Sequence, residues 1–245
     1  MDHRVRRPGL ATCRIPAPIA IMGTVISTPA AVIFDNDGLT LDTEIVWTRA
    51  EVLLFERHGS TFTHEHKVDL VGSAGAVAAA KLERMLGLPA GAGPGLMAEL
   101  HELLAIELER GCEPMPGAVE LLAALAEAGT PVALCSNSPR RFVDIALAGS
   151  GLAATFGVSV AGDEVPRGKP APDPYLAAAA KLGAAAAACI ALEDSPTGAA
   201  SARAAGMRVL GVPSVPGVAL DGQVDAVHAS LEDPELWRAL GLSPS

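Results

Sequence analysis

The sequence predicts a doubly wound α/β fold, a parallel sheet with helices on both faces, into which an all-helical domain is inserted. The first observation behind this prediction is that short apolar or β-branched runs alternate with Ala/Leu-rich stretches of helix-forming composition. A strand–helix–strand succession favours right-handed crossovers and hence parallel strands. The second observation is one long interval, between the first two strands, that carries mainly helical patterns.

Six segments have the composition of strands. The helical stretches between them, such as residues 117–129 and 173–184, end near glycine, which is a common signal for the end of a helix. The six predicted strands are residues 30–34, 131–136, 157–162, 189–194, 208–213 and 225–230.

The long helical interval covers residues 45–112 and predicts a cap domain made of helices. Three helices between consecutive strands exceed a simple crossover and imply an inserted domain. The two crossings, near Glu44 and near residues 111–117, would act as hinges. The three helical patterns are residues 44–59, 74–87 and 95–111.

The remainder of the chain divides into a core and an N-terminal extension. The α/β core domain is predicted to comprise residues 30–44 and 113–245. Residues 1–29 start with basic residues and continue with an apolar stretch that prolines interrupt, unlike the apolar region of a signal peptide. We expect a disordered extension here, with translation from Met22 as an alternative.

The composition argues against several classes of function. The chain has 18 basic and 28 acidic residues and a net charge of −10, which opposes binding to a nucleic-acid backbone. No uninterrupted apolar run reaches the roughly 18 residues needed to cross a membrane. A monomer is the default expectation. The cysteines lack zinc-type spacing and suit a reducing cytoplasm; they are Cys13, Cys112, Cys135 and Cys189.

Paired carboxylates follow the first predicted strand, at the end where open α/β sheets bind ligands. Asp35 and Asp37 are two residues apart in an extended stretch, so their side chains point to the same side, and Gly38 lets the chain turn away. Two like charges this close repel each other unless a cation lies between them or one carries a proton. A calcium loop or an ordinary turn has a similar pattern, but a calcium loop follows a helix.

Two more polar segments follow later strands. Ser136 ends the second strand, and we predict that Ser138 is the N-cap and Pro139 the first residue of the next helix. A hydroxyl and free N–H groups at a helix start suit a phosphate, although a plain cap has the same pattern. Lys169 lies in a Pro/Gly-rich loop, where a lysine is usually a solvated charge.

The fourth polar segment follows the predicted strand at residues 189–194. The strand runs into Glu193 and Asp194, after which Ser195 and Pro196 begin a helix. Such acids can stabilise a helix start, and they can equally supply the hard oxygen ligands that Mg²⁺ prefers.

Together, the four segments resemble the haloacid dehalogenase-like hydrolase superfamily. The resemblance is greater to the branch with a helical cap after the first motif, which includes sugar-phosphate phosphatases and β-phosphoglucomutase. It covers residues from about 30 to 212 and implies a Rossmann-like core. The motifs that carry it are FDNDG with LDTE, SNS, GKPAPDPY and LEDSPTGAASARAAGM.

The resemblance implies a magnesium-dependent reaction on a small phosphorylated metabolite. Asp35 would attack phosphorus to form an aspartyl phosphate, and Asp37 would protonate the leaving oxygen and later deprotonate water. Mg²⁺ would be held by the Asp35 carboxylate, the Asp37 backbone carbonyl and Asp194, with Glu193 as a helper.

The resemblance also implies how substrate is bound. Ser136 and Lys169, with backbone N–H groups near Asn137, would hold the phosphoryl oxygens. The remaining substrate contacts are expected at Gly38, Thr43, Trp47, Gly72 and Ser73.

Phosphate chemistry is favoured because the dehalogenases of the superfamily lack an acid/base aspartate at the position of Asp37. A β-phosphoglucomutase has a Gly-x-Ser-Arg loop preceded by lysine, and a histidine soon after the first motif; here the loop is VGSAG and Trp47 replaces the histidine. A neutral loop would hold a second phosphate poorly, so we prefer a phosphatase to the mutase alternative. A catalytically inactive binding protein is less favoured, because no motif carboxylate is lost.

Some residues near these motifs allow two interpretations. Trp47 would face the substrate or pack between cap helices. His64 and His66 are expected in a solvated turn rather than a metal site. Arg140 and Arg141 would meet either substrate anions or solvent.

Overall fold

The computed structural model describes residues 28–70, 75–214, 219–220 and 222–243. The predicted disordered extension, apart from its last two residues, lies outside the described residues, and so do the predicted substrate contacts Gly72 and Ser73. None of the described helices is long and apolar enough to cross a membrane.

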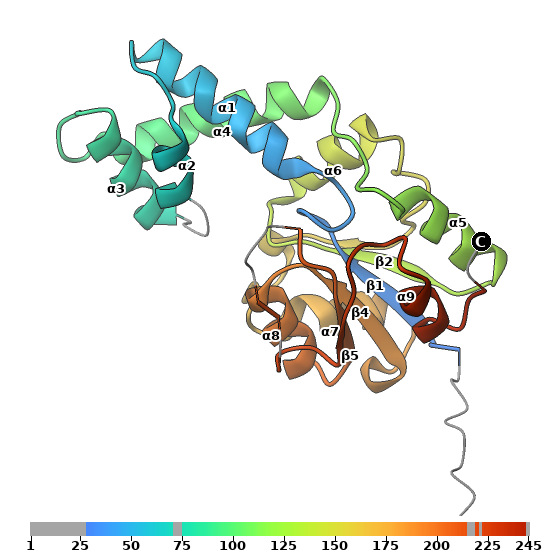
Figure 1. Ribbon diagram of the computed structural model, residues 1–245. Coiled ribbons are helices and arrows are strands. Elements are labelled where there is room, and N and C mark those ends of the chain that lie inside the picture. The colour runs from blue at the N-terminus through green and yellow to red at the C-terminus, as the bar shows by residue number, and fades with distance from the viewer. Residues whose placement is uncertain (1–27, 71–74, 215–218, 221, 244–245) are drawn as a thin grey trace, which may run out of the picture.

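A six-stranded parallel sheet forms the centre of the core, in the order β3-β2-β1-β4-β5-β6 (Figure 1). This arrangement confirms the predicted doubly wound fold. The first strand is central, with β2 and β4 on either side, so the segments that follow these three strands meet at one edge. The strands are β1 (Ala31–Asp35), β2 (Val132–Cys135), β3 (Ser159–Val160), β4 (Cys189–Glu193), β5 (Arg208–Gly211) and β6 (Ala226–Val227).

Alternate residues of β1 enter two different cores. Val32 and Phe34 pack in the core that includes helices α5, α6 and α9, whereas Ala31 and Ile33 pack with α7 and α8. Both faces are covered, which is why the strand is fully buried and apolar up to its last residue, Asp35. The helices are α5 (Ala118–Glu127), α6 (Arg140–Gly149), α7 (Asp173–Lys181), α8 (Pro196–Ala204) and α9 (Pro234–Ala239).

A helical cap is inserted between β1 and β2, beyond the carboxyl end of β1 (Figure 1). Its longest helix, α4, packs against α1, α3 and the core helix α6. The described part of the cap has four helices rather than the three expected, because residues 64–70 also form a helix. They are α1 (Thr43–Arg57), α2 (His64–Leu70), α3 (Gly75–Met85) and α4 (Gly93–Glu109).

The expected turn at His64 and His66 is therefore wrong, since both residues lie in the first turn of α2. The ring of His66 packs against Phe55 and Phe62, with centroids 4.9 and 5.9 Å away. Aromatic packing onto α1 holds this short, polar segment in a helix that its composition alone does not predict.

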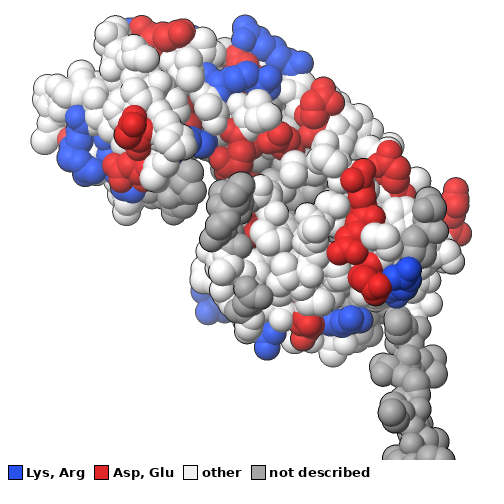
Figure 2. Space-filling model, viewed as in Figure 1, with Lys and Arg blue, Asp and Glu red and all other residues white. Residues whose placement is uncertain are grey.

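The two crossings between the cap and the core run side by side. Leu41 and Pro114 form an antiparallel bridge. The Asp42 N–H donates to the Glu113 carbonyl at 2.9 Å. The cap thus joins the core through two paired backbone segments, and Figure 2 shows the surface hollowed where the two parts meet.

Candidate active site

The first strand ends in a tight turn built around Gly38. Asp35 is buried, and the Thr40 hydroxyl donates to its backbone carbonyl. Gly38 has a φ of 83°, and a Cβ at this position would lie 2.5 Å from Oδ2 of Asp194. Glycine is required both by the left-handed backbone and by the close approach of the Asp194 carboxylate.

A buried lysine joins the ends of β1 and β4. The Lys169 Nζ donates to Oδ1 of Asp35 and, at 2.6 Å, to Oε1 of Glu193. The Tyr175 hydroxyl donates to the same Glu193 oxygen at 2.5 Å. The lysine therefore links two carboxylates, and neither it nor Glu193 is a solvated surface charge.

The loop that carries Lys169 is fixed by Asn137. The Asn137 side-chain amide donates to the Lys169 carbonyl at 3.1 Å, while the Lys169 N–H donates to the amide oxygen at 2.7 Å. A Cβ on Gly168 would approach that oxygen to 2.7 Å, so glycine permits this contact. The Asn137 side chain thus holds the loop in place.

Two hydroxyls bind Asp37. Ser136 and Ser138 donate to Oδ2 of Asp37 at 2.8 and 3.2 Å. The predicted N-cap at Ser138 is wrong, because α6 begins at Arg140 with Pro139 as its N-cap residue. The Ser138 N–H instead donates to Ser136 Oγ at 2.9 Å, which bends this segment so that both hydroxyls reach Asp37.

Three carboxylates converge beside the lysine. Oxygen atoms of Asp35, Glu193 and Asp194 all lie within 4.8 Å of one another. Ser214 holds Asp194 by donating to its Oδ2 at 2.7 Å. Hard oxygen donors gathered this closely suit a divalent cation, which would offset their mutual repulsion.

Burial changes the acidity of these groups. It raises the pKa of Asp35 well above its usual value, although the Lys169 charge opposes this shift. It also raises the pKa of Asp194 to about 6, with neighbouring Glu193 adding to the effect. Burial disfavours the Lys169 ammonium, but Asp35 and Glu193 more than compensate and raise its pKa. A positive lysine among partly neutralised carboxyl groups is the state these shifts favour.

The structure thus brings together the residues predicted at the strand ends. The cap side differs. Trp47 is half-buried and lines a cavity together with Asn137 and Ser138. Its ring also packs edge-to-face against His101, with the ring centroids 6.3 Å apart. Thr43 is buried at the start of α1.

The two arginines after Ser138 pair with carboxylates other than Asp35, Glu193 and Asp194. Arg140 pairs with Glu164 at 2.6 Å, and Arg141 pairs with Glu102 of the cap at 2.7 Å. Both form ion pairs with acidic side chains of the protein.

Two site residues have no role in the sequence-based prediction, Tyr175 and Ser214. Tyr175 is the single tyrosine of the chain and lies in the GKPAPDPY segment. Its rarity and its place in a motif are signals that could have identified it as a site residue. Ser214 contacts Asp194 from 20 residues away, after β5, and no local pattern marks it.

Comparison with known proteins gives consistent matches. The family model described as haloacid dehalogenase-like hydrolase matches residues 29–206. Protein CbbY of Rhodobacter capsulatus is 35% identical over 195 residues, which is 75% of this chain and 85% of that protein. Hexitol phosphatase B of Escherichia coli strain K12 is 32% identical over 195 residues, which is 77% of this chain and 87% of that protein. The crystal structure of a HAD family hydrolase from Deinococcus radiodurans, with bound phosphate and sodium, matches with a TM-score of 0.73 at 28% identity. The match covers 89% of this chain and 100% of that chain.

Proposed function

Because the chain belongs to the haloacid dehalogenase-like hydrolase family, we propose that it hydrolyses the phosphomonoester of a small phosphorylated metabolite, such as a sugar phosphate, with Mg²⁺. The family match and the phosphatase-named relatives make the chain a phosphatase. The proposal therefore concerns its substrate, its metal and its mechanism. Hexitol phosphatase B, among the relatives, supports a sugar or polyol phosphate.

The observation that carries the proposal is the placement of Asp35. Its carboxylate lies at the end of the central strand, bonded to Lys169 and within 4.8 Å of the oxygens of two other acids. A purely structural ion pair would not need two further acids at the same point, because buried like charges repel. Acids gathered in this way can hold a cation, which together with Lys169 would supply the positive charge needed when a carboxylate attacks an anionic phosphate.

In the proposed reaction, an oxygen of Asp35 attacks phosphorus, and the bond from phosphorus to the leaving oxygen breaks. Asp37 gives its proton to that oxygen, so a neutral alcohol leaves and an aspartyl phosphate remains. Asp37 then takes a proton from water as the water attacks phosphorus. The bond to Asp35 breaks, which releases inorganic phosphate and restores the Asp35 carboxylate.

The hydroxyls around Asp37 suit this acid/base role. Both Ser136 and Ser138 donate to Oδ2, which fixes the plane of the carboxyl group. The other oxygen, Oδ1, is then the one available for proton transfer. Lys169 would also hold phosphoryl oxygens. Ser136 would do so if its hydroxyl turned from Asp37 to the substrate.

The carboxylate cluster fits a magnesium ion. Asp35 and Asp194 would be its side-chain ligands, with the Asp37 backbone carbonyl as a third protein ligand. Glu193 fits better as the acceptor that holds Lys169 and Tyr175, since its Oε1 already accepts from both. When bound, the metal would supply charge neutralisation for the phosphoryl oxygens and the neighbouring acids.

Phosphate release from p-nitrophenyl phosphate with Mg²⁺ tests the proposal. We expect turnover that EDTA removes and that Asp35→Asn lowers by about 10⁴-fold or more, as for other loss-of-nucleophile variants. The matched control is Asp144→Asn, which makes the same change on an exposed carboxylate that pairs with Arg140. Activity that survives in Asp35→Asn would contradict the assigned nucleophile.

A further inference from the structure

A cavity of about 290 Å³ lies between the cap and the core, next to the catalytic edge. From the core it is lined by Ser138, whose hydroxyl also donates to Asp37. Its position places it where the part of a substrate beyond the phosphate would lie if Asp37 protonates the leaving oxygen.

One wall of the cavity is apolar. Its side chains come from α2, α3 and α4 of the cap, and Trp47 of α1 adds an aromatic surface. These uncharged groups can form apolar contacts with the carbon atoms of a ligand. The apolar lining residues are Leu70, Ala78, Leu82, Met97 and Leu100.

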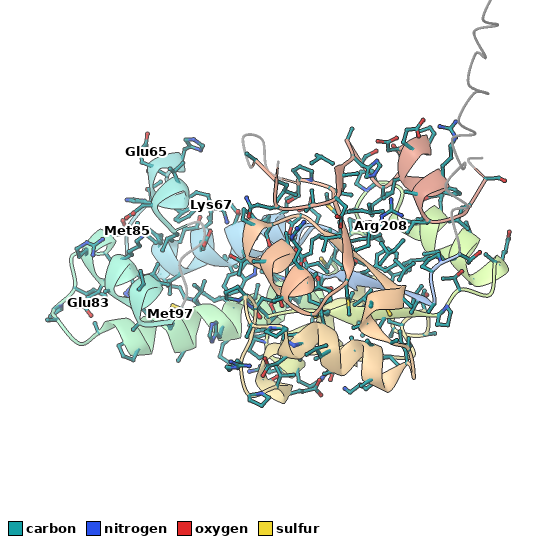
Figure 3. The ribbon with its side chains drawn as sticks, turned by 90° about the horizontal axis from the view of Figure 1, so that it is seen from below. Glu65, Lys67, Glu83, Met85, Met97 and Arg208 are labelled. Atoms are coloured by element: carbon teal, nitrogen blue, oxygen red, sulfur yellow. The ribbon has the colours of Figure 1, made fainter. Side chains whose placement is uncertain are left out.

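Three charged side chains, from α1 and α2, also line the cavity. The Lys67 Nζ lies 3.1 Å from Oε2 of Glu44 and 3.2 Å from Oε2 of Glu51. The Glu51 side chain is only 7% exposed. Figure 3 shows Lys67 on the side of α2 towards α1, whereas Glu65 of the same helix points outward.

These three charges sum to −1 when all are ionised. The only cation of the group is already shared by two carboxylates, so it has little remaining attraction for an incoming anion. A second anionic group on the substrate would meet two carboxylates at short range in a partly buried place, where repulsion is weakly screened. Hydroxyl groups, by contrast, could donate to either carboxylate.

We propose that this cavity binds the leaving group of the substrate, and that the Glu44–Lys67–Glu51 cluster selects an uncharged, hydroxyl-bearing leaving group over one that carries a second anion. The inference rests on the proposed phosphatase reaction. It narrows the substrate class to monophosphates of neutral alcohols whose carbon atoms can pack against the apolar wall of the cavity.

Two aryl phosphates test this selectivity, 4-(hydroxymethyl)phenyl phosphate and 4-carboxyphenyl phosphate. They share the scissile bond and the ring and differ in whether the far end is a neutral hydroxyl or an anion. Phosphate release gives kcat/KM for each. We expect wild-type protein to prefer the hydroxymethyl compound by about tenfold, since one repulsive charge in a partly buried site has an effect of this order.

Variants assign the preference to the cluster. Glu51→Gln should reduce the ratio of the two kcat/KM values towards one, and Glu44→Gln should do so to a smaller extent, because the Glu44 side chain is 51% exposed. Glu65→Gln is the matched control, with the same charge change on an exposed residue of α2, and should keep the wild-type ratio. If Glu51→Gln does not fold, Glu44→Gln carries the test, because its exposed side chain is tolerant of change.

The outcomes separate the two proposals. Failure of wild-type protein to hydrolyse either compound or p-nitrophenyl phosphate would refute the proposed function itself. Hydrolysis of both compounds with equal or reversed preference would overturn the leaving-group inference alone. A preference that persists in both Glu51→Gln and Glu44→Gln would also overturn it, because the cluster would then not be its source.

Discussion

The molecule contains two clusters of the same charges, a lysine between two carboxylates, in very different surroundings. At the strand ends, Lys169 lies between Asp35 and Glu193, and their side chains are 4%, 8% and 0% exposed. In the cap, Lys67 lies between Glu44 and Glu51, with exposures of 21%, 51% and 7%. In the first cluster, two carboxylates at strand ends meet a lysine from a loop and all three side chains are buried, whereas the second cluster borders a cavity and lies on helices α1 and α2.

Burial, not the identity of the charges, decides what such a cluster does. In the interior, each charge depends on its partner, so pKa values shift and the removal of one member is costly. Near solvent, the same ion pairs contribute little to stability and act mainly through the field they present to a ligand. Five predictions test this difference.

The largest effect is expected from Lys169→Met. It leaves Asp35 and Glu193 buried without their cation, so the free energy of unfolding should fall by about 3–5 kcal/mol. Urea denaturation of the metal-free protein measures this change. A loss below about 1 kcal/mol would mean that the buried lysine is not an obligatory partner of these acids.

The next effect is expected from Tyr175→Phe, which removes a hydroxyl that donates to Glu193 in the interior. A hydrogen bond to a charged group contributes about 1.5–3 kcal/mol, and the unfolding free energy should fall by about that amount. Because Glu193 orients Lys169, kcat should also fall while KM changes little. A lower stability with unchanged kcat would restrict Tyr175 to a structural role.

A smaller effect is expected from the titration of Asp194. Its pKa is about 6 in the folded protein and 3.8 in the unfolded chain, so the folded state takes up a proton first as the pH falls. The metal-free protein should therefore gain about 1 kcal/mol in unfolding free energy from this group between pH 7 and pH 5. The change in unfolding free energy between pH 7 and pH 5, measured for wild type and for Asp194→Asn, isolates the contribution of this carboxyl group.

The same titration weakens metal binding, because a proton competes for the Asp194 oxygen. The apparent affinity for Mg²⁺, measured by calorimetry, should decline below about pH 6. An affinity that is constant from pH 7 to pH 5 would argue against Asp194 as a ligand.

The smallest effect on stability is expected from Lys67→Met in the cap. Lys67 and Glu44 are partly solvated, and burial already raises the pKa of Glu51, which can take up a proton once the lysine is gone, so the unfolding free energy should change by about 1 kcal/mol. A loss as large as that of Lys169→Met would erase the contrast between the two clusters. The urea titration used for Lys169→Met measures both variants under identical conditions.

The sequence predicts which segments meet at the candidate site, because each of these segments follows a strand. The ends of parallel strands meet at one edge, so Asp35, Ser136 and Glu193 are brought together by topology once the strands are recognised. The family resemblance adds Lys169, whose partners Asp35 and Glu193 lie on β1 and β4, outside its own loop.

Contacts between distant segments were less predictable. Tyr175 reaches Glu193 across 18 residues, and Ser214 reaches Asp194 across 20, so no helical or strand periodicity links them. The helix at residues 64–70 depends on Phe55 and Phe62 of neighbouring segments, which is tertiary packing overriding weak local propensity.

The proposed mechanism depends most on the covalent step at Asp35, and trapping the aspartyl phosphate tests that step directly. Protein mixed with p-nitrophenyl phosphate and Mg²⁺ would be quenched in acid during turnover and reduced with borohydride, which converts an aspartyl phosphate to homoserine. Peptide mass spectrometry should find homoserine at position 35 in wild-type protein and at no position in Asp35→Asn. Homoserine at another aspartate, or its absence during sustained turnover, would contradict the proposed mechanism.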